Sequence, residues 1–206
     1  MGVGGDVLWE KAINKMLPNC LIFAFDDAGT YSRLFTFGNG TVQFISKRLV
    51  SHSAFVSGVL PPRHSNVTNC TIIADYATLT ATPRKKNSKM VSIANFIQVN
   101  EHTHIEFMKI DIDNGEYVVL YEVMALMRAE RLSVCQLTVE THIGYMRRCT
   151  EHDYHRLVLQ LEHAGFWLFS REVNWGANKQ FLELAYVHGS CARRYGMPRK
   201  THWNFA

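Results

Sequence analysis

The stretch "HIEFMKIDIDNGEYVVLYEVMALMRAERL", residues 104–132, and the "SVCQLTVETH" that follows it at 133–142 decide the fold. The first part, "IEFMKIDI", predicts a buried strand of the kind found in parallel sheets, and it leads into the acidic segment "DIDNGEY". Asn114 and Gly115 predict a turn, and the residues after them have the spacing of an amphipathic helix. Residues 133–142 predict a second buried strand, so the order in this segment is strand, helix, strand.

The same alternation continues on both sides of this segment. Helices are expected over 6–16 and 153–165, and strands over 20–25, 41–50, 166–174 and 181–188. Gly165 predicts the end of the second helix, and the short connection between the last two strands predicts a hairpin. We therefore expect an α/β fold in three layers, with one mostly parallel sheet, helices on both faces and an antiparallel strand pair at the end.

Length and composition narrow the class of protein. The chain has 206 residues, 47% of them apolar, and a formal net charge of +4. These values suit one folded domain over 1–206 and exclude a disordered chain. The basic clusters at 84–86 and 193–200 are not interleaved with aromatic residues, so we predict no nucleic-acid partner. No apolar run is long enough for a transmembrane segment.

The cysteines and the N-glycosylation sequons indicate where in the cell the protein would be found. The sequence has five cysteines but no Cys-x-x-Cys motif, which argues against a zinc ribbon. Cys20 and Cys135 lie in apolar runs and are expected to be small buried hydrophobic residues. Asn39, Asn66 and Asn69 fit the N-glycosylation sequon. They predict the secretory pathway if a signal precedes Met1, and the cytoplasm is expected otherwise.

Polar side chains follow two consecutive predicted strands. Asp111, Asp113 and Glu116 come after the strand in 104–110, and Glu140 and His142 end the next strand. Because ligands of open α/β sheets bind beyond the carboxyl ends of the strands, we expect these side chains to line one site. Glu116 also suits the first turn of a helix, where the helix dipole favours a carboxylate.

A glycine-rich turn opens the sequence. Gly2, Gly4 and Gly5 precede a helix, and an acidic residue, Asp26, ends the predicted strand that follows it. Glycines allow close approach to a ligand, and an acidic side chain about twenty residues further on can accept ribose hydroxyls. A frayed tail and a helix cap are the structural alternatives. The third strand is expected to end near residues 51–53.

Two of these segments resemble the paired motif of FkbM-type S-adenosylmethionine-dependent methyltransferases. They are "MKIDIDNGEYVVL" at 108–120 and "VCQLTVETH" at 134–142. Further segments are similar to the animal branch of that family: "GVGGDVLWEK" at 2–11, "PNCLIFAFD" at 18–26, "AGFWLFSREVN" at 164–174 and "ELAYVH" at 183–188. The resemblance implies a Rossmann-like class I methyltransferase fold and S-adenosyl-L-methionine as the cofactor.

The resemblance also implies roles for the residues. Gly2, Gly4 and Gly5 would face the methionine part of the cofactor, Asp26 would hold its ribose, and Asp113 would line the pocket.

Near the transferred methyl group, the resemblance implies a catalytic set. Asp111, with Glu116 beside it, would line the pocket, and Glu140 and His142 would close the same side. His142 would be a general base if an acceptor hydroxyl reaches it, because its ordinary pKa lies near neutrality. The acceptor would be a small molecule, a glycan or a protein.

The sequence departs from the family pattern at its start. The first strand of such a sheet normally ends in the glycine turn, and at most Met1 could belong to it here. We therefore expect further residues upstream in the full-length protein. The alternative functions are a catalytically inactive binding or scaffolding module and a nicotinamide-dependent oxidoreductase, which cofactor binding would distinguish.

Overall fold

The computed structural model describes residues 8–26, 42–50, 52–57, 89–112, 115–143, 150–174 and 181–197, and the structural statements below concern these residues. The helices are α1 (Leu8–Met16), α2 (His52–Ser57), α4 (Ile93–Val99), α5 (Glu116–Arg128), α6 (Glu151–His163) and α7 (Gly189–Ala192). The strands are β1 (Ile22–Asp26), β2 (Val42–Ser46), β3 (Arg48–Leu49), β4 (Met90–Val91), β5 (His104–Ile110), β6 (Ser133–His142), β7 (Phe166–Asn174) and β8 (Phe181–His188).

The strands form three sheets. The largest has the order β5-β6-β8-β7, in which β5 and β6 are parallel and β8 runs antiparallel to both of its neighbours. The pairs β1-β2 and β3-β4 are both parallel. The predicted α/β class and the terminal hairpin are therefore confirmed. The prediction of one mostly parallel sheet is wrong for the described residues, because the four-stranded sheet is mixed and no backbone ladder joins it to β1-β2.

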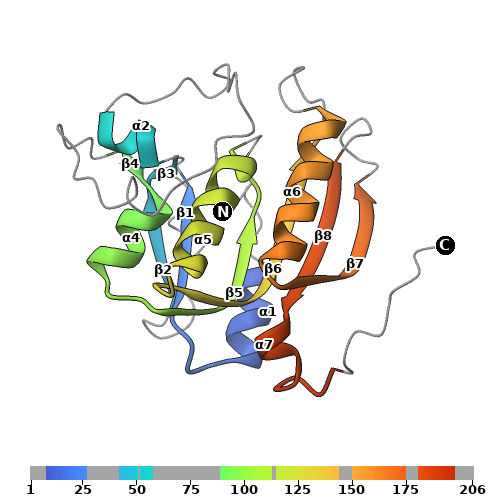
Figure 1. Cartoon of the computed structure of the whole chain (residues 1–206). Coiled ribbons are helices and arrows are strands. Elements are labelled where there is room, and N and C mark those ends of the chain that lie inside the picture. The colour runs from blue at the N-terminus through green and yellow to red at the C-terminus, as the bar shows by residue number, and fades with distance from the viewer. Residues whose placement is uncertain are drawn as a thin grey trace.

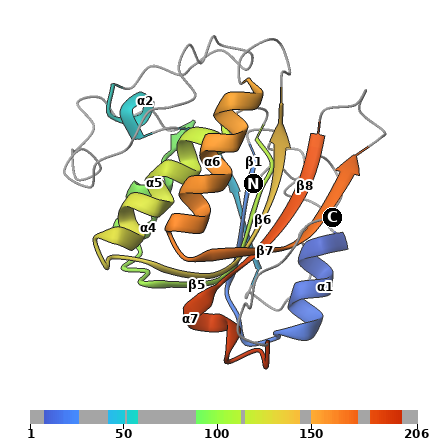
Figure 2. The ribbon, with the colours of Figure 1, turned by 45° about the vertical axis from the view of Figure 1, so that its right-hand side comes forward.

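Helices lie on both sides of the strands. In Figures 1 and 2, α4, α5 and α6 lie on one side, and α1 lies on the other. The core between α5, α6 and the four-stranded sheet includes Leu120, Met124, Leu137, Leu161 and Tyr186, all nearly inaccessible to solvent. Burying the leucine and methionine side chains contributes about 1.5–3 kcal/mol each. This packing fixes the carboxyl ends of β5 and β6 next to the start of α5.

Three local predictions differ from the structure in their bounds. The expected strand over 41–50 is divided into β2 and β3, because the chain bends at Lys47, whose backbone N–H donates to the carbonyl of Ile45 at 2.7 Å. The third strand, β3, ends at Leu49, and residues 52–57 form α2. The helix expected over 153–165 begins two residues earlier, at Glu151.

The ends of this helix have clear local causes. At its start, Thr150 and Asp153 form a capping box, in which each side chain accepts from the backbone N–H of the other residue. At its end, Gly165 has a φ of +91°, a left-handed conformation that glycine adopts without strain. Gly165 is therefore confirmed as the residue that ends α6.

An apolar cavity of about 330 Å³ lies between β1 and β5. Phe23 and Phe25 of β1 and Ile105 and Phe107 of β5 line it, and Phe96 of α4 closes it against β1. Among the described strands, β1 pairs with β2 only and β5 with β6 only, so each presents an unpaired backbone edge.

A disulfide joins Cys135 in β6 to Cys191 in α7, 56 positions further along the chain. Cys135 is buried as predicted, but it is half of a disulfide and not a free, small hydrophobic residue. Cys20 is half-buried and has a free thiol. The spacing of the cysteines does not reveal this pairing, because the hairpin of β7 and β8 is what returns α7 to β6.

In the part of the chain that the structure describes, no helix has the length and apolar character needed to cross a membrane.

Candidate functional site

Three predicted site residues meet at the carboxyl ends of β5 and β6. Asp111 directly follows β5, and Glu140 and His142 lie among the last three residues of β6. One ligand atom from each of the three lies within 4.8 Å of the other two. His142 is 3% exposed, whereas the side chain of Asp111 is 32% exposed. The cluster therefore has a buried imidazole at its base and a carboxylate that reaches solvent.

His142 is held by Glu116, the first residue of α5. Oε1 of Glu116 accepts from the backbone N–H of His142 at 3.0 Å and lies 2.9 Å from its Nδ1. Because this oxygen is an acceptor, Nδ1 carries the hydrogen, and Nε2 is the nitrogen that faces Asp111, with 3.9 Å between Nε2 and Oδ1. The ring also contacts Phe181, with the centroids 4.4 Å apart. These contacts fix both the tautomer and the orientation of the imidazole.

The surroundings raise the pKa of His142. Burial acts to lower the pKa, but the hydrogen bond to Glu116 and the charge of that carboxylate act in the opposite direction. The charges of Asp111 and Glu140 add to the increase. The net effect is a pKa above the ordinary value for histidine, so the cluster favours a positive charge at this position.

Carboxylates form a row across the four-stranded sheet. Glu140 in β6 lies opposite Glu183 in β8, and Glu183 lies opposite Glu172 in β7. Asp111 continues the row, because Ile110 before it pairs with Val139 before Glu140. Burial raises the pKa of Glu140, and the charges of Asp111 and Glu183 raise it further. We call these four residues (Asp111, Glu140, Glu183 and Glu172) the carboxylate row.

No protein-family model matches this chain, and no curated protein matches it.

The other predicted site residues are placed only in part. Asp26 is the last residue of β1, paired with Ser46, and only its backbone position is described. Gly2, Gly4, Gly5 and Asp113 lie outside the described residues, as do the sequon residues Asn39, Asn66 and Asn69. Their predicted roles therefore stay predictions.

Sequence reasoning missed two contacts of the site. Asn174 at the end of β7 donates from Nδ2 to Oε1 of Glu140 at 3.0 Å. Glu183 raises the pKa of Glu140 through its charge, and burial in turn raises the pKa of Glu183. The predicted hairpin over 166–188 brings Glu183 near the site, but the pairing register that places it in the carboxylate row is seen only in the structure. The Glu116–His142 contact has a weaker signal: Glu116 begins the helix that follows β5, and His142 ends β6, the strand parallel to β5.

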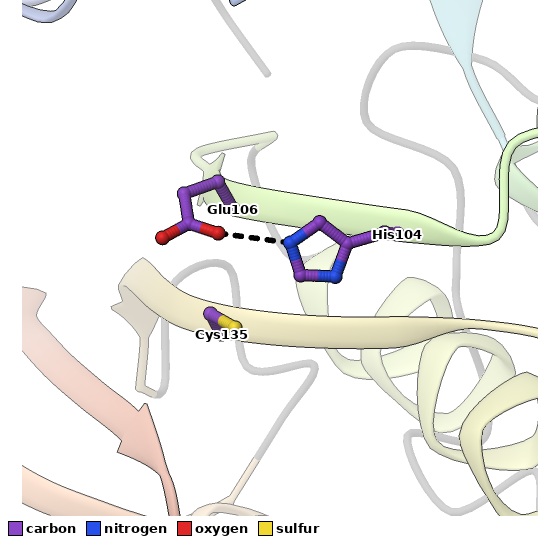
Figure 3. A group of neighbouring side chains, drawn as sticks. All are labelled: His104, Glu106 and Cys135. Carbon is purple, nitrogen blue, oxygen red and sulfur yellow. Dashed lines mark hydrogen bonds and ion pairs between the residues drawn. The ribbon is translucent and has the colours of Figure 1, made fainter. Parts of the chain in front are cut away.

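A second polar cluster lies at the opposite end of β5. Figure 3 shows His104 and Glu106 of β5 above Cys135 of β6, with 2.8 Å between Nε2 of His104 and Oε2 of Glu106. Arg194 also donates to Oε2 of Glu106, at 2.7 Å, and the hydroxyl of Tyr195 bonds the other oxygen. The sulfur of Cys135 is bonded to Cys191. This cluster is therefore a structural contact between β5 and the chain after α7, in which Arg194 and the carboxylate of Glu106 are already paired.

The cluster of Asp111, Glu140 and His142 has the groups needed for proton transfer. A neutral imidazole can accept a proton at Nε2, and Glu116 can hold the resulting imidazolium. The apolar cavity between β1 and β5 is a separate feature, since none of these three residues lines it.

Proposed function

We propose that this protein is an S-adenosylmethionine-dependent methyltransferase that methylates an oxygen or nitrogen acceptor. The observation that carries the proposal is the cluster of Asp111, Glu140 and His142 at the carboxyl ends of two parallel strands. That edge is where open α/β sheets bind ligands. The resemblance of 108–120 and 134–142 to the FkbM-type motif supports the same assignment, because the motif residues lie at this edge.

The proposal includes the finer description of the fold. We infer that β2-β1 and β5-β6-β8-β7 correspond to the two halves of a Rossmann-like class I methyltransferase sheet. The parallel pairs, the antiparallel strand β8 and the cavity between β1 and β5 support this inference. In such an arrangement Asp26, at the end of β1, and Asp111, after β5, end at the same edge of the fold.

The proposed chemistry divides between the cofactor and the chain. When bound, S-adenosylmethionine supplies an electrophilic methyl group. Asp26 is proposed to hold its ribose, and Asp111 to line the pocket beside it. Nε2 of His142 takes the proton from the acceptor hydroxyl or amine, and Glu116 stabilises the charged ring. Glu140 lies next to this path and helps to orient the acceptor. Methyl transfer otherwise requires mainly positioning and exclusion of water.

Cofactor titration tests the proposal. Calorimetry with S-adenosylmethionine and S-adenosylhomocysteine is expected to give saturable binding with one site per chain. Asp26→Ala is expected to weaken binding by about tenfold to a hundredfold, the effect of losing a charged hydrogen-bond acceptor. Glu162→Gln is the control, because Glu162 is exposed near the end of α6, at the opposite edge of the sheet, and the affinity of this variant should match that of the wild type.

The other outcomes favour the alternative functions. Absence of heat with both ligands would contradict the proposal and favour an inactive binding module. Binding of a nicotinamide dinucleotide in their place would favour an oxidoreductase. If the Asp26→Ala variant binds with wild-type affinity, Asp26 does not hold the ribose, but S-adenosylmethionine remains the proposed cofactor.

A further inference from the structure

We propose that Asp111, Glu140 and His142 bind one divalent transition-metal ion. The three side chains offer two carboxylate oxygens and one imidazole nitrogen within 4.8 Å of one another. Three ligands of such an ion lie at about 2.1 Å from it, and therefore about 3.0–3.6 Å from one another. Nε2 of His142 and Oδ1 of Asp111 are already 3.9 Å apart, and the side chain of Asp111, a third exposed, has the freedom to move the remaining distance.

Glu116 gives His142 the geometry of a metal ligand. Histidines that bind metals donate their other ring N–H to a carboxylate or carbonyl, which fixes the tautomer and the ring. Here Nδ1 bonds to Glu116 at 2.9 Å, and Nε2 is the nitrogen that faces Asp111. Glu116 is fully buried, and its second oxygen, Oε2, has no hydrogen-bond partner in the described structure. A buried carboxylate in this state is stabilised by a nearby cation.

The carboxylate row provides an independent reason for a cation. Like charges placed directly opposite each other on neighbouring strands destabilise a sheet. Glu140 and Glu183 are such a pair, and so are Glu183 and Glu172. Lys109 and His142 act on Glu183 with the opposite charge. A divalent ion at Asp111 and Glu140 would offset the repulsion around Glu140, the most buried member of the row, where solvent screens least.

The donor set indicates the class of ion. Carboxylates alone suit Mg²⁺ or Ca²⁺, whereas an imidazole ligand favours first-row transition metals. Two carboxylates with one histidine therefore fit Mn²⁺ or Zn²⁺ better than Mg²⁺ or Ca²⁺. Three protein ligands also leave coordination positions for water or for an acceptor oxygen.

The role of the ion, unlike its binding, rests on the proposed function. A bound divalent ion lowers the pKa of a coordinated hydroxyl, so an acceptor O–H would lose its proton to water. Nε2 of His142 would then be a ligand and would not accept the proton. Metal binding and cofactor binding are measured separately, so failure of one leaves the other open to its own test.

Titration with Mn²⁺ tests the site. The full chain, freed of metal by a chelator and without S-adenosylmethionine, is titrated and free Mn²⁺ is followed by electron paramagnetic resonance. We expect one ion per chain, displaced by Zn²⁺ and less readily by Mg²⁺ or Ca²⁺. Asp111→Asn is expected to weaken binding by more than the roughly tenfold to hundredfold effect of changing a residue that only supports a ligand. Glu172→Gln is the matched control, since it removes an exposed member of the carboxylate row that is not a ligand.

A spectroscopic measurement on the wild-type chain needs no variant. Pulsed electron paramagnetic resonance of the bound Mn²⁺ is expected to show coupling to one imidazole nitrogen, and Glu116→Gln is expected to change that coupling. Absence of bound Mn²⁺ at millimolar concentration, binding without nitrogen coupling, or unchanged affinity in Asp111→Asn would each overturn the proposal.

Discussion

Replacement of Glu116 by alanine is expected to lower the free energy of unfolding by about 3 kcal/mol. The carboxylate is fully buried and accepts from the backbone N–H of His142 as well as from its Nδ1. Without it, two buried donors lose their acceptor. Urea denaturation followed by circular dichroism, with a chelator present, measures the change.

Two further variants separate the causes. Glu116→Gln keeps an acceptor oxygen and is expected to lose about half as much stability. Glu162→Ala removes an exposed carboxylate and should stay within about 0.5 kcal/mol of the wild type. A double-mutant cycle with His142→Ala should give a coupling energy above about 1 kcal/mol. If Glu116→Ala lowers the free energy of unfolding by less than about 1 kcal/mol, the contact contributes little to stability.

The effect of Glu116 should also depend on pH. The pKa of His142 is raised in the folded state by its hydrogen bond to Glu116 and by the surrounding carboxylates, despite burial. The folded state therefore binds a proton more tightly than the unfolded state. This stabilisation is fully present below the unfolded pKa of histidine and is lost as the pH rises through the higher folded pKa. The difference in the free energy of unfolding between wild type and Glu116→Ala is thus expected to shrink as the pH rises from the unfolded pKa of histidine through the higher folded pKa of His142.

Loss of the Cys135–Cys191 disulfide is expected to produce the second large effect. The bond joins residues 56 positions apart, and the chain-entropy relation for a loop of this length gives about 4 kcal/mol. For a protein of this size the midpoint of thermal unfolding should fall by roughly 10 °C. The variant Cys135→Ala/Cys191→Ala is preferred to a reductant, because both sulfur-bearing residues are buried.

Cys20→Ser is the control for this experiment. Its thiol is free, so the substitution should leave the midpoint within about 2 °C of the wild type. Mass spectrometry after alkylation under denaturing conditions should identify a 135–191 cross-link in the wild type. A midpoint unchanged in the double variant, or free thiols at both positions, would contradict the pairing.

The elements around the site are predictable from the sequence because their signals are local. Strand β6 spans the predicted 133–142, because apolar and β-branched residues fill this short segment directly after the helix. The hairpin of β7 and β8 follows from two β-rich segments with a short connection. Asp111, Glu140 and His142 meet because parallel strands end at one edge, a rule that requires only the strand order.

The remaining features depend on contacts between distant parts of the chain. Helix α5 has the spacing of an amphipathic helix, yet its residues 116–126 are all buried, because the sheet and α4 cover faces that the sequence alone leaves undetermined. The disulfide depends on where α7 returns, and the bend at Lys47 has no strong sequence marker. Asn174 and Glu183 reach the site through the pairing register of the hairpin, which the spacing of the two segments does not fix.

The unpaired edges of β1 and β5 have a consequence for cooperativity. Within the described ranges, side-chain packing around an apolar cavity joins the β1-β2 pair to the four-stranded sheet, without shared backbone hydrogen bonds. Units connected in this way open with separate free energies. The β1-β2 pair, which ends at Asp26, can therefore open sub-globally while the sheet that carries Asp111 and His142 stays intact, so the two sides of the proposed cofactor site differ in local stability.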